Sequence, residues 1–269
     1  MKEIVIVFIT AVFTIGAWGQ GVENGHEYVD LGLPSGTLWA TCNVGAEMPE
    51  AFGNYFAWGE TKPKEVYRWE TYKWCKGSDD SMTKYNIASD YGTVDNKKVL
   101  DAEDDAATAN WGSAWRMPTT EEQDELREGC DWEWVEDFNG SGVNGQLGTS
   151  KKNGATIFLP AAGDRIDADL YNVGYGYYWS SSLVEGNPYY AFSLLFYDGY
   201  IFSLLRAGCP CGFEIAPIVP QRQAAPATRD CDVVSSSLIH IKNAIGIQRR
   251  FYNTSHAPHG ELASITKLS

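Results

Sequence analysis

Histidine is scarce in this sequence. It has four histidines among 269 residues, and His26 is the one that precedes residue 208. Nucleophilic serine or cysteine chemistry needs a neighbouring base, most often histidine. Ser180, Ser181 and Ser182 lie in a predicted strand without the sharp turn that exposes a nucleophilic serine. We therefore predict no catalytic residues and interpret the three serines as ordinary strand hydroxyls.

Basic residues are also few. Lys and Arg number 21 against 35 Asp and Glu, which gives a formal net charge of −14. An acidic surface repels phosphate backbones, so we expect no nucleic-acid partner. We interpret the negative charge as a contribution to solubility.

Long apolar runs are missing after the first 19 residues. Ile4 to Ile15 forms an apolar stretch after Lys2, and Ala17-Trp18-Gly19 offers the small residues that a signal peptidase needs. The stretch is too short to span a bilayer. We predict that residues 1–19 are a signal peptide and that the protein is exported to the periplasm, the cell surface or the medium, without a membrane span. The alternative is a buried N-terminal strand.

The six cysteines match no zinc spacing. An exported protein can oxidise its cysteines, but Cys42, Cys75 and Cys130 allow at most one pair before residue 208. Cys209 and Cys211 are separated by one residue, which suits neither redox motifs nor most metal sites. We predict no cofactor and no metal, and we leave a disulfide among the first three cysteines open.

The composition changes near residue 208. Residues 209–269 hold six basic and four acidic residues, whereas the first 208 hold 15 and 31. All ten tryptophans occur at or before Trp179. We therefore predict a domain over residues 26–208 and an atypical tail over residues 209–269, which opens with a Pro- and Ala-rich linker.

Two helices are predicted in the middle of the chain. Asp101 is a candidate N-cap for a helix over residues 102–110. Thr119 and Glu122 form a capping box, which predicts a second helix that ends at Gly129.

Strands are predicted on both sides of these helices. Asp198-Gly199 lies between two apolar runs and indicates a tight hairpin. Residues 60–95 are polar with scattered aromatics, so we expect long loops packed by their rings. The order of strands, helices and strands predicts an α+β fold with an antiparallel sheet. The predicted strands are 28–33, 37–42, 54–58, 155–159, 177–183, 190–196 and 200–205.

Six blocks of the sequence resemble the Fibrobacter succinogenes major paralogous domain, over residues 26–208. The Trp115–Thr119 block also looks like one in C-type-lectin-like and formylglycine-generating-enzyme-like domains. The resemblance implies export, no established activity, and a C-type-lectin-like fold with a small twisted antiparallel sheet, two helices and long loops. The blocks are residues 26–40, Gly53-Asn54-Tyr55-Phe56-Ala57-Trp58-Gly59-Glu60, Asp104-Asp105-Ala106-Ala107, Asn110-Trp111-Gly112 with Trp115-Arg116-Met117-Pro118-Thr119, Leu159-Pro160-Ala161-Ala162-Gly163, and Tyr178-Trp179-Ser180-Ser181.

Aromatic residues offer candidate platforms for a sugar. Trp132 and Trp134 point to one face if they lie on a strand, and Tyr171 and Tyr175 flank a Gly-rich loop. We predict these four as ligand-binding residues. The alternative is that the same rings fill the core of a loop-rich domain.

Carboxylates are the other candidate groups. Asp164, Asp167, Asp169 and Asn172 cluster in one predicted loop, which leaves calcium binding open, although the spacing is not that of an EF-hand. Three carboxylate pairs could in principle serve glycoside hydrolysis, but helix capping explains two of them. They are Asp104/Asp105, Glu121/Glu122 and Asp131/Glu133.

The family's closing strand, of the form Gly-x-x-Val-Arg-x-Val, is replaced here by Cys209-Pro210-Cys211-Gly212-Phe213. If the codons for these residues are read in a frame shifted by two bases, they can encode a Val-Arg block. We therefore expect residues 209–269 to be a frameshifted or disordered tail, with loss of the last strand and an exposed sheet edge. The alternative is a genuine linker and tail.

These features together favour an exported, non-enzymatic binding or surface-interaction module with a glycan or another cell-surface polymer as its partner. Two alternatives remain, a degenerate enzyme of the formylglycine-generating type and a purely structural cell-surface domain.

Overall fold

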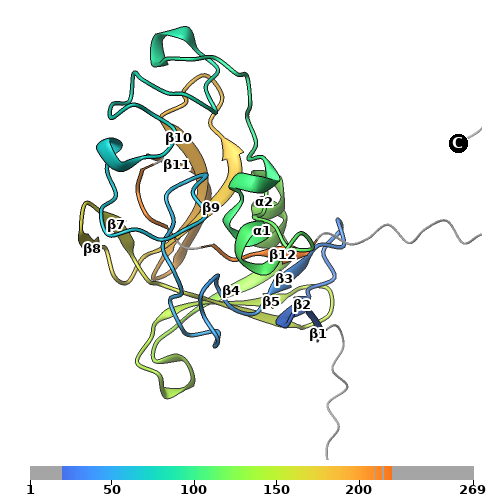
Figure 1. Cartoon of the computed structure of the whole chain (residues 1–269). Coiled ribbons are helices and arrows are strands. Elements are labelled where there is room, and N and C mark those ends of the chain that lie inside the picture. The colour runs from blue at the N-terminus through green and yellow to red at the C-terminus, as the bar shows by residue number, and fades with distance from the viewer. Residues whose placement is uncertain (1–19, 209, 214, 220–269) are drawn as a thin grey trace, which may run out of the picture. The chain divides into compact units, whose positions relative to one another are not determined.

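Four small antiparallel sheets form the framework of the protein (Figure 1). The structure is a computed structural model, and it describes residues 20–208, 210–213 and 215–219. The predicted signal peptide, residues 1–19, lies outside the described residues, as does the tail from residue 220 onward. All described residues belong to one compact unit.

The largest sheet has the strand order β1-β2-β3-β12. Two three-stranded sheets have the orders β11-β10-β9 and β4-β5-β6, and β7 pairs with β8. The strands are β1 Gln20–Glu23, β2 His26–Asp30, β3 Leu38–Ala40, β4 Cys130–Val135, β5 Gly145–Ser150, β6 Thr156–Pro160, β7 Asp164–Ile166, β8 Asp169–Tyr171, β9 Gly176–Leu183, β10 Tyr190–Tyr197, β11 Tyr200–Gly208 and β12 Ile218–Val219.

The helices are few and short. The α-helices are α1 Ala106–Trp111 and α2 Thr120–Gly129, and the 3-10 helices are η1 Trp69–Thr71, η2 Ser89–Tyr91, η3 Ala102–Asp104 and η4 Phe138–Gly140. The structure therefore confirms a mixed α and β fold of small antiparallel sheets with few helices. Among the described residues, no helix is long and apolar enough to cross a bilayer.

The second predicted helix is confirmed, and the first is shorter than predicted. Thr119 caps α2, and its hydroxyl accepts from the N–H of Glu122 while the Glu122 carboxylate accepts from the N–H of Thr119. The prediction that Asp101 caps a helix over residues 102–110 is wrong. Asp105 caps α1 instead, because its carboxylate accepts from the N–H of Thr108.

The core consists of two clusters of buried side chains. One is rich in tryptophan, with Trp58, Trp115 and Trp179 buried completely. The other joins α2 to the β9–β11 sheet, since Leu126 packs in the same cluster as Phe196. Figure 1 shows α1 and α2 beside this sheet. Packing of the apolar face of a helix against a sheet stabilises both elements, because each has an apolar face that it cannot bury by itself.

Local signals predicted two further features correctly. Asp198-Gly199 forms the tight turn between β10 and β11, with Tyr197 opposite Tyr200. Gly199 has a φ of 76°, which a residue without a side chain adopts at little cost. Residues 60–95 are loops with two short 3-10 helices, packed by buried rings such as Tyr72 and Tyr85.

The predicted strand over residues 54–58 is absent. Phe56 forms an isolated bridge in which its N–H and C=O both pair with Phe213. Gly53 and Gly59 flank the segment with φ values of 80° and 74°, so the chain turns away on both sides before a ladder can extend.

The predicted end of the domain at Gly208 and the predicted loss of the last strand are both wrong. Phe213, Ile215 and Ile218 are buried in the core clusters. Ile218 in β12 lies opposite Trp39 in β3. The prediction was wrong because a change in charge and tryptophan content does not show which side chains are buried. These three apolar side chains fill the core despite the change in composition.

Candidate functional site

A cavity of about 510 Å³ lies between a loop, a hairpin and the chain after β11. Its walls combine aromatic, charged and small apolar side chains. They are Tyr67, Arg68, Trp69, Glu70, Asp79, Ile166, Asp167, Tyr189, Tyr190, Gly208, Pro210 and Cys211. Pockets of this size and mixture are typical of small-ligand sites. We call it the aromatic pocket.

The rings of the aromatic pocket support one another edge to face. Tyr189 contacts Trp69 with centroids 5.6 Å apart at 71°, and it contacts Tyr91 at 4.8 Å and 72°. Tyr190 lies 6.0 Å from Tyr189. Edge-to-face contacts are favourable for aromatic pairs and hold each ring in a defined orientation. The pocket therefore presents a preassembled set of ring surfaces.

Backbone contacts hold the walls together. Tyr67 and Asp167 exchange hydrogen bonds of 2.8 and 3.0 Å, which join the loop before η1 to the β7–β8 hairpin. Arg165 and Gly212 exchange another pair, both of 2.9 Å. A side chain at position 212 would meet the Tyr67 ring at 2.7 Å, so glycine permits this close approach. These contacts join three segments that are distant in the sequence, namely the loop before η1, the β7–β8 hairpin and the chain at Gly212, into one wall of the pocket.

Charged groups sit at the edge of the rings. Arg68 and Asp167 form an ion pair of 2.7 Å, and about half of each side chain is exposed. The Tyr189 hydroxyl donates to Asp79 at 2.6 Å. This hydrogen bond raises the pKa of Tyr189 to about 12, with partial burial and the Asp79 charge acting in the same direction. The hydroxyl therefore remains protonated and a donor at neutral pH.

The predicted platform on β4 faces the core. Trp132 and Trp134 share one face of the strand, as alternation predicted, and both pack against the second core cluster. Trp132 lies over Gly148, and its indole N–H donates to the carbonyl of Arg127 at 3.0 Å. Neither ring lines the aromatic pocket. The arrangement agrees with the alternative interpretation, in which these rings fill the core.

Tyr171 and Tyr175 are exposed, but they also lie outside the aromatic pocket. Tyr171 ends β8 opposite Asp164. Tyr175 belongs to a row of rings on one face of the β9–β11 sheet, which we call the aromatic strip. The strip consists of Tyr175, Tyr177, Tyr197, Tyr200 and Phe202.

The loop over residues 164–172, where the sequence left calcium binding open, does not bring its carboxylates to one point. Asp164 is buried and accepts from the Asn172 amide at 2.8 Å, and burial raises the pKa of this carboxyl. Asp167 pairs with Arg68 instead. Asp169 is exposed. These groups face different partners and are not among the described residues that gather at metal-ligand spacing.

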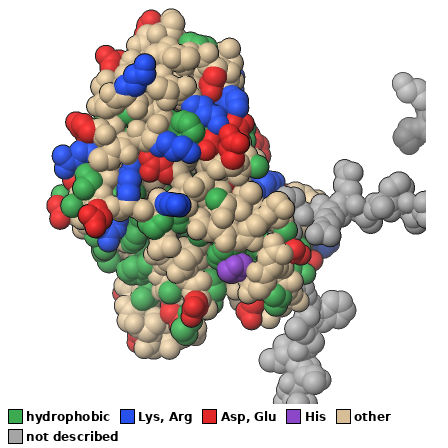
Figure 2. Space-filling model, viewed as in Figure 1, with side chains coloured by type: hydrophobic (Ala, Val, Ile, Leu, Met, Phe, Trp, Pro, Cys, Tyr) green, Lys and Arg blue, Asp and Glu red, His purple; other side chains and the backbone are tan. Residues whose placement is uncertain are grey.

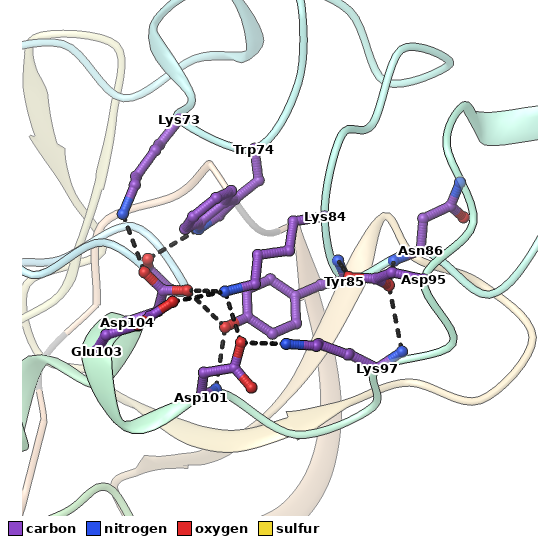
Figure 3. A network of polar contacts seen from close by, with 11 residues as sticks. Lys73, Trp74, Lys84, Tyr85, Asn86, Asp95, Lys97, Asp101, Glu103 and Asp104 are labelled. Atoms are coloured by element: carbon purple, nitrogen blue, oxygen red, sulfur yellow. Dashed lines mark hydrogen bonds and ion pairs between the residues drawn. The ribbon is translucent and has the colours of Figure 1, made fainter.

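A different acidic cluster does gather, around Lys84 (Figure 3). The Lys84 ammonium lies 2.6 Å from both Asp101 and Asp104 and 3.4 Å from Glu103. Burial alone would lower the pKa of Lys84, but hydrogen bonds to Asp101 and Asp104 outweigh it and hold the pKa well above its ordinary value. The ammonium itself supplies the positive charge at this cluster, so we assign the network a structural role.

Two more of the residues labelled in Figure 3 contact the buried Asp104. Tyr85 donates its hydroxyl at 2.7 Å, and Lys73 approaches at 3.0 Å. Burial alone would raise the pKa of Asp104, but the bonds from Lys84, Tyr85 and Lys73 hold it below the ordinary value. On the face shown in Figure 2, basic and acidic side chains likewise lie close together.

Capping accounts for one carboxylate of each pair near the helices. Asp105 accepts from the N–H groups of Thr108 and Met117, and its burial raises its pKa. Glu122 closes the capping box and also pairs with Arg116. The pair Asp131/Glu133 lies on exposed positions of β4, outside the aromatic pocket.

Among the residues that the structure describes, His26 and Cys42 line one pocket, which contains no serine. The described cysteines Cys42, Cys75, Cys130 and Cys211 are free thiols, so the open disulfide among the first three does not form. Burial raises the pKa of Cys130 and of Cys211 to about 11. His26 stacks on Trp111 at 3.8 Å, with the ring planes 9° apart.

The sequence does not reveal the aromatic pocket. Trp69 lies in η1, whereas Tyr189 directly precedes β10 and Tyr190 begins it, more than 100 residues later, and nothing local marks them as neighbours. A weak signal existed, because Tyr189-Tyr190 follows Pro188 in a polar turn, where rings are unusual. Comparisons with protein-family models, with curated proteins and with solved structures found no match.

Proposed function

We propose that this protein is an exported, non-enzymatic carbohydrate-binding module and that the aromatic pocket is its site. One observation carries the proposal. Trp69, Tyr189 and Tyr190 present ring surfaces beside the hydrogen-bonding groups of Arg68 and Asp79. Apolar faces of a sugar stack on rings, and its hydroxyls need fixed donors and acceptors.

The size of the site supports the same class of ligand. A volume of about 510 Å³ falls in the range of small-molecule sites and accommodates a short oligosaccharide end. The walls are braced by backbone pairs and ring contacts rather than by single flexible side chains. A preassembled site loses little conformational entropy on binding.

The family assignment belongs to this proposal. The six sequence blocks that resemble the Fibrobacter succinogenes major paralogous domain and the implied C-type-lectin-like fold are supported by small antiparallel sheets, two α-helices and long loops. The loop over residues 60–95 supplies Trp69 and Asp79 to the aromatic pocket. Long loops that carry function on a rigid scaffold are common among binding domains.

Two observations support a binding role over an enzymatic one. Asp167 pairs with Arg68, and one oxygen of Asp79 accepts from the Tyr189 hydroxyl, so both carboxylates are fixed in the wall of the cavity as binding groups. The four described cysteines line different parts of the protein, which disfavours the alternative of a formylglycine-generating type of enzyme.

A glycan array with the full chain tests the proposal. We expect binding to a defined group of glycans and a loss of about tenfold or more for Trp69→Ala and Tyr190→Ala, because truncation of a central ring removes the main contact. Trp132→Ala is the matched control on β4, with melting temperature measured for all variants. Absence of any bound glycan, or pocket variants that bind like the unchanged protein, contradicts the proposal.

A further inference from the structure

The charges of the aromatic pocket do not balance. Three carboxylates and one guanidinium line it. Arg68 is committed to Asp167 at 2.7 Å. Glu70 and Asp79 have no basic partner among the residues that the structure describes. Two negative charges therefore remain beside the rings without a counter-charge from the described residues.

Asp79 is held in place for a further contact. Its Oδ2 accepts the Tyr189 hydroxyl at 2.6 Å, while its Oδ1 has no hydrogen-bond partner among the described residues. Tyr189 is itself fixed by ring contacts with Trp69 and Tyr91. A carboxylate with one oxygen anchored and the other available is a preorganised acceptor for a charged donor.

The rings favour the same sign of charge. Aromatic faces carry a negative quadrupole, so Trp69, Tyr189 and Tyr190 attract a cation that lies over them. The hydrogen bond to Asp79 raises the pKa of Tyr189, and the charges of Asp79 and of the neighbouring Asp80 act in the same direction. Carboxylates and ring faces thus act together on a bound cation.

We infer that the aromatic pocket selects a sugar that carries a protonated amine, such as a 2-amino-2-deoxyhexose unit, over N-acetylated or uronic sugars. This inference rests on the proposed carbohydrate function and names its ligand class. The amine binds the carboxylates of Asp79 and Glu70, and the pyranose ring stacks on Trp69. Uronic sugars are repelled because their carboxylate meets two unpaired negative charges.

Calorimetry with three trimers tests the inference on the full chain. The ligands are a glucosamine trimer, its N-acetylated counterpart and a galacturonate trimer, at a pH well below the pKa of the sugar amine. We expect the glucosamine trimer to bind at least about fivefold more tightly than the acetylated one, since a partly exposed ion pair contributes on that order. The preference is expected to shrink as salt is added, because exposed charges are screened.

Charge-removing variants make the test specific. Asp79→Asn keeps an oxygen that can accept from the Tyr189 hydroxyl, and Glu70→Gln keeps the side-chain length. Both are expected to lower affinity for the glucosamine trimer more than affinity for the acetylated trimer, so that the preference between the two ligands shrinks. Glu133→Gln removes an exposed carboxylate on β4 and serves as the control.

The outcomes separate this inference from the proposed function. Equal binding of the amine and acetylated trimers, or a preference that survives both charge variants, overturns the inference and leaves carbohydrate binding in place. Binding of oligolysine without binding of the glucosamine trimer overturns the sugar assignment. Absence of binding to every glycan on the array removes the proposed function and the inference together.

Discussion

The hydroxyl of Tyr189 donates a hydrogen bond of 2.6 Å to the carboxylate of Asp79, across 110 residues of sequence. The same ring contacts Trp69 and Tyr91 edge to face. Tyr189 therefore ties the turn before β10 to the long loops over residues 60–95. The wall of the aromatic pocket depends on this junction, because neither segment belongs to a sheet there.

Removal of the Tyr189 ring is expected to affect binding more than removal of its hydroxyl. Tyr189→Phe should weaken glycan binding about threefold, because Asp79 loses one anchoring hydrogen bond, and Tyr189→Ala should weaken it more than about tenfold. Calorimetry with a glycan identified on the array measures both. Tyr200→Ala, at an exposed position of the aromatic strip, is the control. Equal effects of Tyr189→Ala and Tyr200→Ala contradict the assignment of the pocket.

Lys84→Met is expected to destabilise the fold strongly. The Lys84 side chain is 15% exposed and contacts Asp104, which is 3% exposed. The substitution leaves a buried carboxylate with less compensation and should lower the free energy of unfolding by about 3 kcal/mol. Lys97→Met is the control, since Lys97 is 43% exposed and contacts Asp101, and it should cost less than about 1 kcal/mol. Urea unfolding followed by fluorescence measures both, and similar losses would refute the role given to Lys84.

Glu122 is expected to stabilise the protein in a pH-dependent manner. Burial alone would raise its pKa, but hydrogen bonds from Arg116 and the Thr119 N–H hold the pKa below its ordinary value of 4.5. The contribution of Glu122 to the free energy of unfolding is therefore complete at pH values above its pKa in the unfolded chain. This contribution is lost as the pH falls through the lower pKa of Glu122 in the folded protein.

Glu122→Gln should accordingly lower the free energy of unfolding by about 1.5 kcal/mol at pH 7, because hydrogen bonds to a charged group are lost. The difference from the unchanged protein should shrink steadily below the ordinary pKa of 4.5. Denaturant unfolding across a pH series measures this. Glu121→Gln, in the same turn of α2, is the control, and a pH-independent difference would contradict the argument.

Phe213→Ala tests whether the chain after Gly208 belongs to the domain. Phe213 is 3% exposed and stacks on Trp179 at 4.2 Å. We expect a loss of about 3–4 kcal/mol in the free energy of unfolding, the usual cost of deleting a buried ring. Phe202→Ala, at a position that is 43% exposed, should cost far less. If both variants unfold at the same denaturant concentration, the residues after Gly208 do not complete the core.

Local chemistry explains which predictions succeeded. The capping box at Thr119 and Glu122 formed as expected, because the two groups are three residues apart and satisfy each other within one turn. Asp198-Gly199 made its hairpin for the same reason. Asp101 failed as a cap, because Lys84 and the nearby Lys97 bind its carboxylate.

Long-range contacts explain which predictions failed. Alternation placed Trp132 and Trp134 on one face of a strand, but only the packing of β4 decided that this face meets the core. The segment around Phe56 has strand-like composition, yet its partner is Phe213, far along the chain. Burial of Phe213 also could not be inferred from the composition break near residue 208.

The sequence by itself determined the α+β class, the second helix with its cap, the β10–β11 hairpin and the ring-packed loops, because each depends on residues close together in the chain. Only the tertiary structure decided which rings are exposed, that the four described cysteines are unpaired, and that Phe213, Ile215 and Ile218 complete the core. It also assembled the aromatic pocket, since a site built from Trp69, Asp167 and Tyr189 exists only where three distant segments meet. Local hydrogen bonds are determined by residues close together in the sequence, whereas this binding site forms only when segments distant in the sequence pack against one another.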